Sequence, residues 1–319
     1  VLQCLRVGLS VTYQCPSLAS ASCLATRPWS LSDPVFTPAA MRAHVEFLAD
    51  DLLKGRDTGS EGHEIAARYV ASQFDGLGLK PAGDADGQGR SWLQRITFQK
   101  TERTQTPATL TVSGPAGDQR FTHAGDVLIG MNAAEPRLDV RAPLVFVGYG
   151  LENQRLGLND YAGLDVEGKI VVTLRGYPKG LPSEEGAHLS ATKAMVAEKH
   201  GAIGMLSLGT LQSMKARPWA RMVQFAAESD FTWVSPEGKP FDQAPGIRAG
   251  AALNDPAAEA VFADAPQSIA AIRKLADRKG GKPKGFALKT SVRIQSDSAS
   301  QRVTSPNVVA ILPGSDPVL

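Results

Sequence analysis

Three segments that are almost entirely apolar constrain the fold of this chain more than any other feature. They are 143–150 (PLVFVGYG), 169–176 (KIVVTLRG) and 202–209 (AIGMLSLG). Apolar runs of this length are typical of strands that are buried on both faces of a sheet. Residues 187–200 carry Leu189, Met195 and Val196 on what would be the inner side of a helix. The pattern predicts a β-α-β unit, in which the two strands are parallel.

Two helices are predicted near the N-terminus. Thr37 is a suitable N-cap, and Pro38 suits the first helical position, where its missing N–H has no cost. Apolar side chains then recur at helical spacing as far as Gly55; they are Met41, Val45, Leu48 and Leu52. Ser60 is the N-cap predicted for a second helix, which ends at 76–78. Its apolar face consists of Ile65, Ala66, Tyr69, Val70 and Phe74.

Shorter elements are predicted in the rest of the chain. Alternating segments across 92–130 indicate antiparallel strands and hairpins, whereas 210–285 indicates long surface loops. The remaining predicted elements are strands at 291–295 and 307–312 and short helices at 257–262 and 268–275. Gly148 and Gly150 lack the third glycine and the following helix of a dinucleotide-binding loop. We therefore interpret them as glycines at the end of a strand.

Charge and hydropathy exclude two classes of partner. The formal net charge is only +2, and the basic stretch 273–284 (RKLADRKGGKPK) is short and contains no aromatic residue. We interpret this stretch as a solvated linker and expect no nucleic-acid partner. No apolar run is long enough for a transmembrane helix, so no membrane span is expected.

The cysteines lie only in the N-terminal segment. They are Cys4, Cys15 and Cys23, so residues 24–319 offer no disulfide, thiol nucleophile or cysteine ligand for a metal. Residues 1–34 are interpreted as a degraded or incomplete leader, in which the small residues 19–21 resemble a signal-peptidase site. An ordinary flexible N-terminus is the other interpretation.

No complete catalytic constellation is visible in the residues themselves. His63 and Glu64 begin an HExxH zinc motif, but Ala67 occupies the position of the second histidine, so His63 is predicted to be a first-turn surface residue. The histidines are far apart in the sequence: His44, His63, His123, His188 and His200. There is no GxSxG nucleophile elbow.

Three longer stretches, taken together, resemble a known family. They are 44–83 (HVEFLADDLLKGRDTGSEGHEIAARYVASQFDGLGLKPAG), 142–208 (from APLVFVGYG to KHGAIGMLSL) and 305–317 (SPNVVAILPGSDP). Their order and character are similar to the zinc aminopeptidases of metallopeptidase family 28 that carry an inserted protease-associated domain. The resemblance covers most of residues 37–319.

This resemblance implies an α/β fold, with an incomplete mixed-sheet zinc-peptidase domain and an inserted α+β protease-associated domain. The implied organisation is a leader or disordered segment at 1–34, the first part of the peptidase domain at 35–135, the insert at 136–285 and a return to the peptidase domain at 286–319. We expect the insert to fold alone and the rest to be poorly packed. The strand 307–312 would re-enter the peptidase sheet.

The implied activity is hydrolysis of the amino-terminal peptide bond of peptide substrates by two zinc ions in the full-length protein. In the family the metal ligands follow the turn after this strand, so we expect every ligand beyond Leu319 and no bound zinc or catalysis in this chain. Arg56, in the loop 55–59, is the one residue that we place near the substrate cleft; a salt-bridging surface arginine is the alternative. The resemblance also suggests a periplasmic or secreted protein.

Two other functions stay open. A protease-associated domain without catalysis would bind peptides or proteins, and a sugar- or peptide-binding α/β domain unrelated to peptidases is a third possibility. Substrate specificity, oligomeric state and the choice between amino- and carboxypeptidase activity do not follow from the residues.

Overall fold

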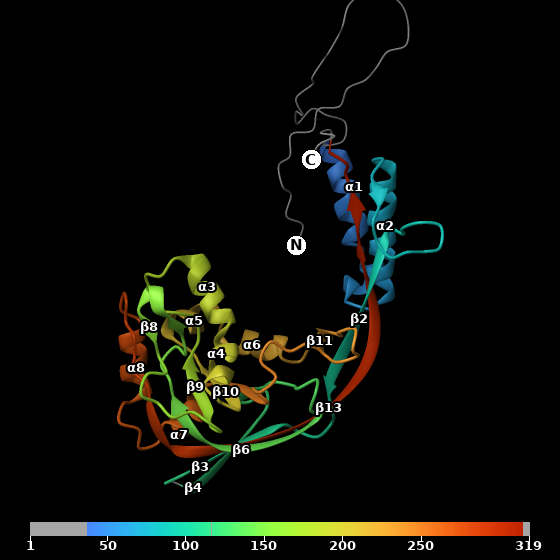
Figure 1. Ribbon diagram of the computed structural model, residues 1–319. Helices are drawn as coiled ribbons and strands as arrows, with labels where there is room; N and C mark the ends of the chain where they lie inside the picture. Colours follow the sequence, from blue (N-terminus) through green and yellow to red (C-terminus); the bar gives the residue numbers. More distant parts are fainter. Residues whose placement is uncertain (1–36, 116, 315–319) are drawn as a thin grey trace, which may run out of the picture. The chain divides into compact units, whose positions relative to one another are not determined.

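The computed structural model describes residues 37–115 and 117–314. The fold is mixed α/β with a mixed sheet, which confirms the coarse fold class predicted from the sequence. Contacts divide the chain into two compact units, Val1–Arg95 with Ser305–Leu319 and Ile96–Thr304 (Figure 1). We call them the first and the second unit. The predictions about Cys4, Cys15, Cys23 and the leader 1–34 concern residues outside the described ranges.

The helices of the first unit begin at the predicted caps. Helix α1 (Pro38–Leu48) begins after Thr37, whose side chain accepts a hydrogen bond from the Ala40 N–H. Helix α2 (Glu61–Gly76) begins after Ser60, whose Oγ accepts from the His63 N–H. The first helix is shorter than expected, because Asp50 caps a separate 3₁₀ helix, η2 (Asp51–Arg56).

Helices α1 and α2 lie side by side, and two aromatic contacts hold them together (Figure 1). The rings of Phe47 and Tyr69 stack at 4.3 Å, and Nδ1 of His44 lies 2.8 Å from the Tyr69 hydroxyl. A short antiparallel pair, β1 (Lys80–Pro81) and β14 (Ala310–Ile311), completes the regular structure of this unit. The predicted strand at 307–312 is therefore split, since Val308 still belongs to the preceding strand β13.

Four parallel strands form the centre of the second unit. They are β6 (Arg137–Phe146), β9 (Ile170–Leu174), β10 (Gly204–Leu208) and β12 (Ala249–Leu253), adjacent in that order. The pairings β6–β9, β9–β10 and β10–β12 are all parallel. The predicted β-α-β unit is confirmed, but β12 lies where the sequence predicted surface loops.

Antiparallel strands extend this sheet on both sides. They are β2 (Leu93–Arg103), β3 (Thr109–Gly114), β4 (Gly117–Thr122), β5 (Val127–Ile129), β11 (Asp230–Trp233) and the long β13 (Phe286–Val308). The hairpins predicted within 92–130 are confirmed by the β3–β4 pairing. The strand predicted at 291–295 is the part of β13 that pairs with β3 and β6.

Helices cover both faces of the parallel strands. They are α3 (Ser183–Ala191), α4 (Lys193–Lys199), α5 (Leu211–Ala216), α6 (Trp219–Phe225), α7 (Asp255–Val261) and α8 (Ile269–Ala276). Phe146 and Val172 share a buried cluster with α7 and α8, whereas their neighbours Val145 and Val171 pack with Ala197 of α4. Alternate residues of each strand therefore pack against helices on opposite faces of the sheet. A small pair, β7 (Glu152–Asn153) and β8 (Leu158–Asn159), flanks η3 (Gln154–Leu156).

The units do not follow the boundaries expected from the sequence, 135/136 and 285/286. The chain divides within β2, between Arg95 and Ile96, and within β13, between Thr304 and Ser305. The physical reason is strand pairing, because β5 pairs with β12 and β3 pairs with β13 inside the second unit. Segments that we assigned to the peptidase-like part thus supply core side chains to the second unit.

Candidate functional site

The residue predicted to lie near a substrate cleft, Arg56, ends η2 with a left-handed backbone (φ 60°). Its carbonyl oxygen lies 3.4 Å from Nδ1 of His63. Within 37–115 and 117–314 no carboxylate forms an ion pair with its guanidinium, so the alternative of a salt-bridging arginine is not observed. Its role in a cleft stays a prediction.

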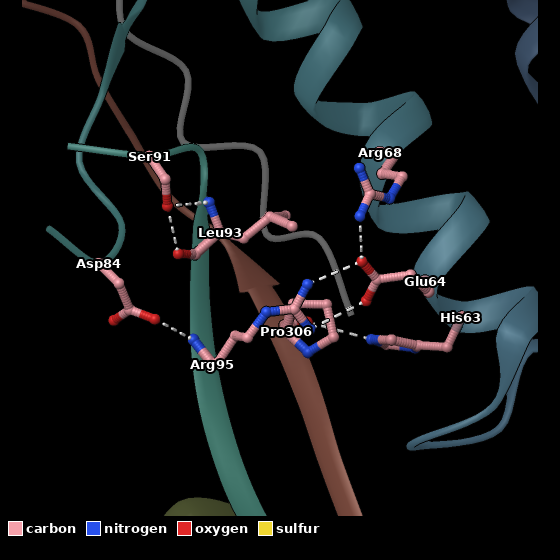
Figure 2. Close-up of polar contacts among 8 residues, drawn as sticks. All are labelled: His63, Glu64, Arg68, Asp84, Ser91, Leu93, Arg95 and Pro306. Carbon is pink, nitrogen blue, oxygen red and sulfur yellow. Dashed lines mark hydrogen bonds and ion pairs between the residues drawn. The ribbon is translucent and has the colours of Figure 1, made fainter. Parts of the chain in front are cut away.

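The truncated HExxH motif forms a set of internal contacts (Figure 2). Glu64 accepts hydrogen bonds from Arg95 (2.8 and 3.2 Å) and from Arg68 (2.9 Å), and Arg95 is the main reason that the pKa of Glu64 is lowered. Nε2 of His63 lies 3.1 Å from the Pro306 carbonyl oxygen. These contacts join α2 to the two strand ends of the first unit.

The five histidines are not brought together. Those outside α1 and α2 contact separate partners: His123 accepts from the Ile129 N–H, and His200 stacks on Tyr161 at 4.4 Å. Among the described residues, no group of three or more His, Cys, Asp or Glu side chains could hold a metal ion. The described part of the chain therefore does not fit a zinc site, and we derive no chemical step through one.

A cluster of buried polar and charged groups lies in the second unit, where the parallel strands end. Because parallel strands end at the same side of a sheet, the residues that follow them meet there, and such crevices are the usual ligand sites of α/β sheets. We call this region the carboxyl edge. It consists of Tyr149 and Gly150 after β6, Arg175 to Tyr177 after β9, Gly209 and Thr210 after β10, and Asn254 and Asp255 after β12.

Lys193, a buried lysine in the first turn of α4, forms hydrogen bonds with the backbone at the carboxyl edge. Nζ of Lys193 donates to the carbonyl oxygens of Leu174 (2.7 Å) and Gly176 (2.6 Å), and it lies 5.6 Å from the centre of the Tyr149 ring. Burial lowers the pKa of Lys193 to about 7, with Asp160 opposing this effect. The lysine fixes the carbonyl groups at the end of β9, and with them the start of the loop that carries Arg175.

Two glycines let Tyr149 reach this position. Gly148 and Gly150 have φ values of 63° and 71°, which L-residues rarely adopt. A Cβ at Gly148 would lie 2.5 Å from the Pro283 carbonyl oxygen, and one at Gly150 would lie 2.8 Å from the Thr173 side chain. The tyrosine hydroxyl donates to the Ala276 carbonyl oxygen (3.3 Å), and burial raises its pKa to about 12. The interpretation as strand-end glycines is confirmed.

A second buried cation corrects the interpretation of 273–284 as a solvated linker. Arg273 belongs to α8, is only 9% exposed, and donates to the Gly209 carbonyl oxygen (2.9 Å) and to Asp255 (2.7 Å). It joins the ends of β10 and β12 to α8. The apolar residues Ile269, Ile272 and Ala276 are also buried on this helix, so Arg273 lies within its inner face.

Two neighbouring cavities open at the carboxyl edge. The first, of about 350 Å³, is lined by Arg175, both tyrosines Tyr149 and Tyr177, and the start of α5. The second, of about 110 Å³, is lined by Arg175 again, with Arg217 and Trp219. Arg175 therefore lies between the two cavities.

A larger cavity, of about 620 Å³, lies elsewhere in the second unit. Its lining includes Asp230, Phe231, Phe241 and Arg248. The charge of Arg248 is balanced by Glu135 at 2.5 Å, and burial raises the pKa of Asp230.

Sequence reasoning did not find Arg175, Lys193 or Arg273. The burial of Lys193 could have been predicted from the sequence, because Lys193 is four residues from both Leu189 and Ala197. This spacing places it on the same face of the predicted helix 187–200 as these two buried residues. Arg175 had only its position directly after a buried strand. No protein-family model matches this sequence, and no curated protein is similar enough to it to count as a match. No helix among the described residues is long and apolar enough to cross a membrane.

Proposed function

We propose that this chain is the non-catalytic, substrate-selecting part of an exported, metal-dependent aminopeptidase, whose zinc ligands and general base lie outside residues 1–319. The second unit would be the protease-associated domain, and the first unit would be a part of the peptidase domain. Peptides are the proposed substrates, and two zinc ions are the proposed cofactor of the complete enzyme.

The observation that carries this proposal is a set of large apolar side chains that are exposed in the first unit. No residue of α1 is buried, and Met41 and Val45, one helical turn apart, are 51% and 61% exposed. Leu52 of η2 is 85% exposed, and Ile311 of β14 is 53% exposed. Several large apolar side chains exposed in one unit are typical of a surface that another protein surface covers. The catalytic part of a peptidase domain is the partner that the motifs at 44–83 and 305–317 suggest.

Activity of the complete gene product tests the proposal. We expect the polypeptide translated from the whole reading frame to release amino-terminal residues from short peptides, to lose this activity on chelation, and to regain it with zinc. The 319-residue chain alone should hydrolyse none of these peptides. A reading frame that stops after Leu319, or a complete product without peptidase activity, would contradict the proposal.

A non-catalytic binding module is the second candidate, and one observation favours it. Both cavities at the carboxyl edge of the second unit are lined by Arg175, which forms no ion pair with any carboxylate in the described ranges 37–115 and 117–314, and this suits ligand binding without any metal. Peptide binding by a chain whose complete gene product hydrolyses nothing would favour this function over the enzyme.

A further inference from the structure

We propose that the carboxyl edge of the second unit binds a small molecule or peptide end that bears a carboxylate, with the Arg175 guanidinium as the group that binds the anion. Arg217 is the second cation of this site. The inference does not depend on the peptidase proposal, because it concerns a binding event that needs no metal.

The charge balance at the carboxyl edge singles out Arg175. Two of the other cations are neutralised by ion pairs, Lys179 with Asp277 at 2.5 Å and Arg273 with Asp255 at 2.7 Å. The ammonium of Lys193 donates to two carbonyl oxygens. In the described part of the chain, no ion pair involves Arg175 or Arg217.

The contacts of Arg175 are weak for a charged group. One terminal nitrogen lies 2.7 Å from the Met222 sulfur, and the other lies 3.4 Å from Oγ of Ser207. Burial, and then the nearby charge of Arg217, lower the pKa of Arg175, but an arginine remains protonated in proteins. A half-buried cation without a counter-charge is costly, and an anion bound between the two arginines would remove that cost.

The available donors favour a carboxylate over a phosphate. An arginine can bind either anion, but a phosphate has more oxygen atoms that need donors, and phosphate-binding loops supply them as several backbone N–H groups. Here the nearest candidates are already used, because the Thr210 N–H donates to Oγ of Ser213 (2.9 Å) and the Ser213 N–H donates to Oγ1 of Thr210 (3.2 Å). What remains is the planar guanidinium, whose paired N–H groups match the two oxygens of a carboxylate.

The first cavity at the carboxyl edge has room for the body of such a ligand. Its volume of about 350 Å³ is within the range of small-molecule sites. Tyr149, Tyr177, Ala216 and Ala276 contribute apolar surface to its lining, next to Arg175. An acyl group or a small amino-acid side chain would contact these residues while the carboxylate binds the guanidinium.

Ligand-observed NMR titrations of the 319-residue chain at low ionic strength test the proposal. The probes are N-acetylalanine, which imitates a peptide C-terminus, propionate as a free organic acid, N-acetylalaninamide as the uncharged match, and inorganic phosphate. We expect both carboxylates to bind and the amide to bind at least about ten-fold more weakly. Tighter binding of N-acetylalanine than of propionate would identify a peptide end as the ligand, and equal binding a free acid.

Variants assign the binding to this site. Arg175→Gln should weaken N-acetylalanine binding about ten-fold or more, whereas Arg155→Gln, at an exposed arginine that pairs with Glu185 elsewhere in the second unit, should leave it unchanged. Arg217→Gln should weaken N-acetylalanine binding several-fold. Because Arg217 is exposed, this substitution should leave the fold intact, so it tests the site even if Arg175→Gln disturbs folding.

Four results would overturn the inference. They are no binding of either carboxylate, equal binding of the amide, tighter binding of phosphate than of N-acetylalanine, and wild-type affinity in a folded Arg175→Gln variant. Where only Arg217→Gln folds, wild-type affinity of that variant would have the same meaning.

Discussion

At the scale of single residues, buried cations distinguish the second unit. Lys193 and Arg273 are 5% and 9% exposed, and each joins the end of a strand to a helix through carbonyl oxygens. A buried charge is costly unless hydrogen bonds or an opposite charge compensate it, so these residues fix one geometry of the carboxyl edge rather than add much net stability.

Lys193 predicts how stability depends on pH. The pKa of Lys193 is about 7 in the folded chain, whereas that of an ordinary lysine is 10.5. Between these pH values the side chain is protonated in the unfolded chain but not in the folded chain, so the unfolded chain binds one more proton. The free energy of unfolding should therefore rise with pH from about 7 to 10, by on the order of 4 kcal/mol at most. Tyr149, with its pKa raised to about 12, acts in the opposite direction, but only above pH 10.

Denaturant unfolding at a series of pH values measures this slope. In Lys193→Met the rise between pH 7 and 10 should disappear. Lys199→Met is the matched control, since Lys199 is on the same helix but forms an exposed pair with Glu152, and it should keep the slope. An unchanged slope in Lys193→Met would mean that another group is responsible.

At the scale of elements, helix α2 and the 3₁₀ helix η2 approach each other at a glycine. A Cβ at Gly62 would lie 1.8 Å from the Leu53 carbonyl oxygen, and because this oxygen belongs to the backbone, it cannot move aside cheaply. Gly76, at the other end of the same helix, has no atom within 4 Å of such a Cβ. The same substitution at Gly62 and at Gly76 therefore compares a crowded position with an open one on the same helix.

Gly62→Ala should destabilise α2 by about 1–3 kcal/mol through overpacking. Gly76→Ala should change its stability by less than about 1 kcal/mol, in the stabilising direction. Native-state hydrogen exchange of the α2 amides measures both effects. Equal exchange rates in the two variants would show that the close approach of α2 and η2 is absent in solution.

Local patterns predicted most elements but not their partners. Caps and periodicity located α1, α2, α7 and α8, and unbroken apolar runs located the three central strands. Strand β12 (AGAAL) was missed because its small side chains carry little of the hydrophobic signal of a strand. Met195 was expected on an inner face but is 44% exposed, because α3 and α4 are separate helices and Lys193 takes the buried position.

The candidate site could not be predicted from the sequence, and the reason differs from the one that applies to strand β12. The residues of the carboxyl edge lie far apart in the sequence, and only the order of strands brings them together. Arg175 and Arg217 become neighbours because β9 pairs with β10 and helix α5 leads from the end of β10 to Arg217. The sequence predicted the pairing of these strands but not the position of α5.

At the scale of the whole molecule, the division into units predicts which fragment folds. Residues 96–304 contain every strand of the extended sheet of the second unit except the parts of β2 and β13 that lie beyond it. The shorter fragment 136–285, expected from the sequence to fold alone, lacks the buried side chains of β3, β5 and β13. They are Leu110, Val112, Val127, Ile129, Val292 and Ile294.

We therefore expect 96–304 to unfold in one cooperative thermal transition and 136–285 to show none. Differential scanning calorimetry of the two fragments, at equal concentration, distinguishes them. A cooperative transition in 136–285 would restore the domain boundaries expected from the sequence.

We propose that a catalytic segment outside these 319 residues covers the exposed apolar side chains of α1 and η2. Hydrogen–deuterium exchange over 38–56, in the 319-residue chain and in the complete gene product, tests it most directly. We predict markedly slower exchange in the complete product, because covering Met41, Val45 and Leu52 suppresses local unfolding of α1 and η2. The same exchange rates in both proteins would contradict the claim.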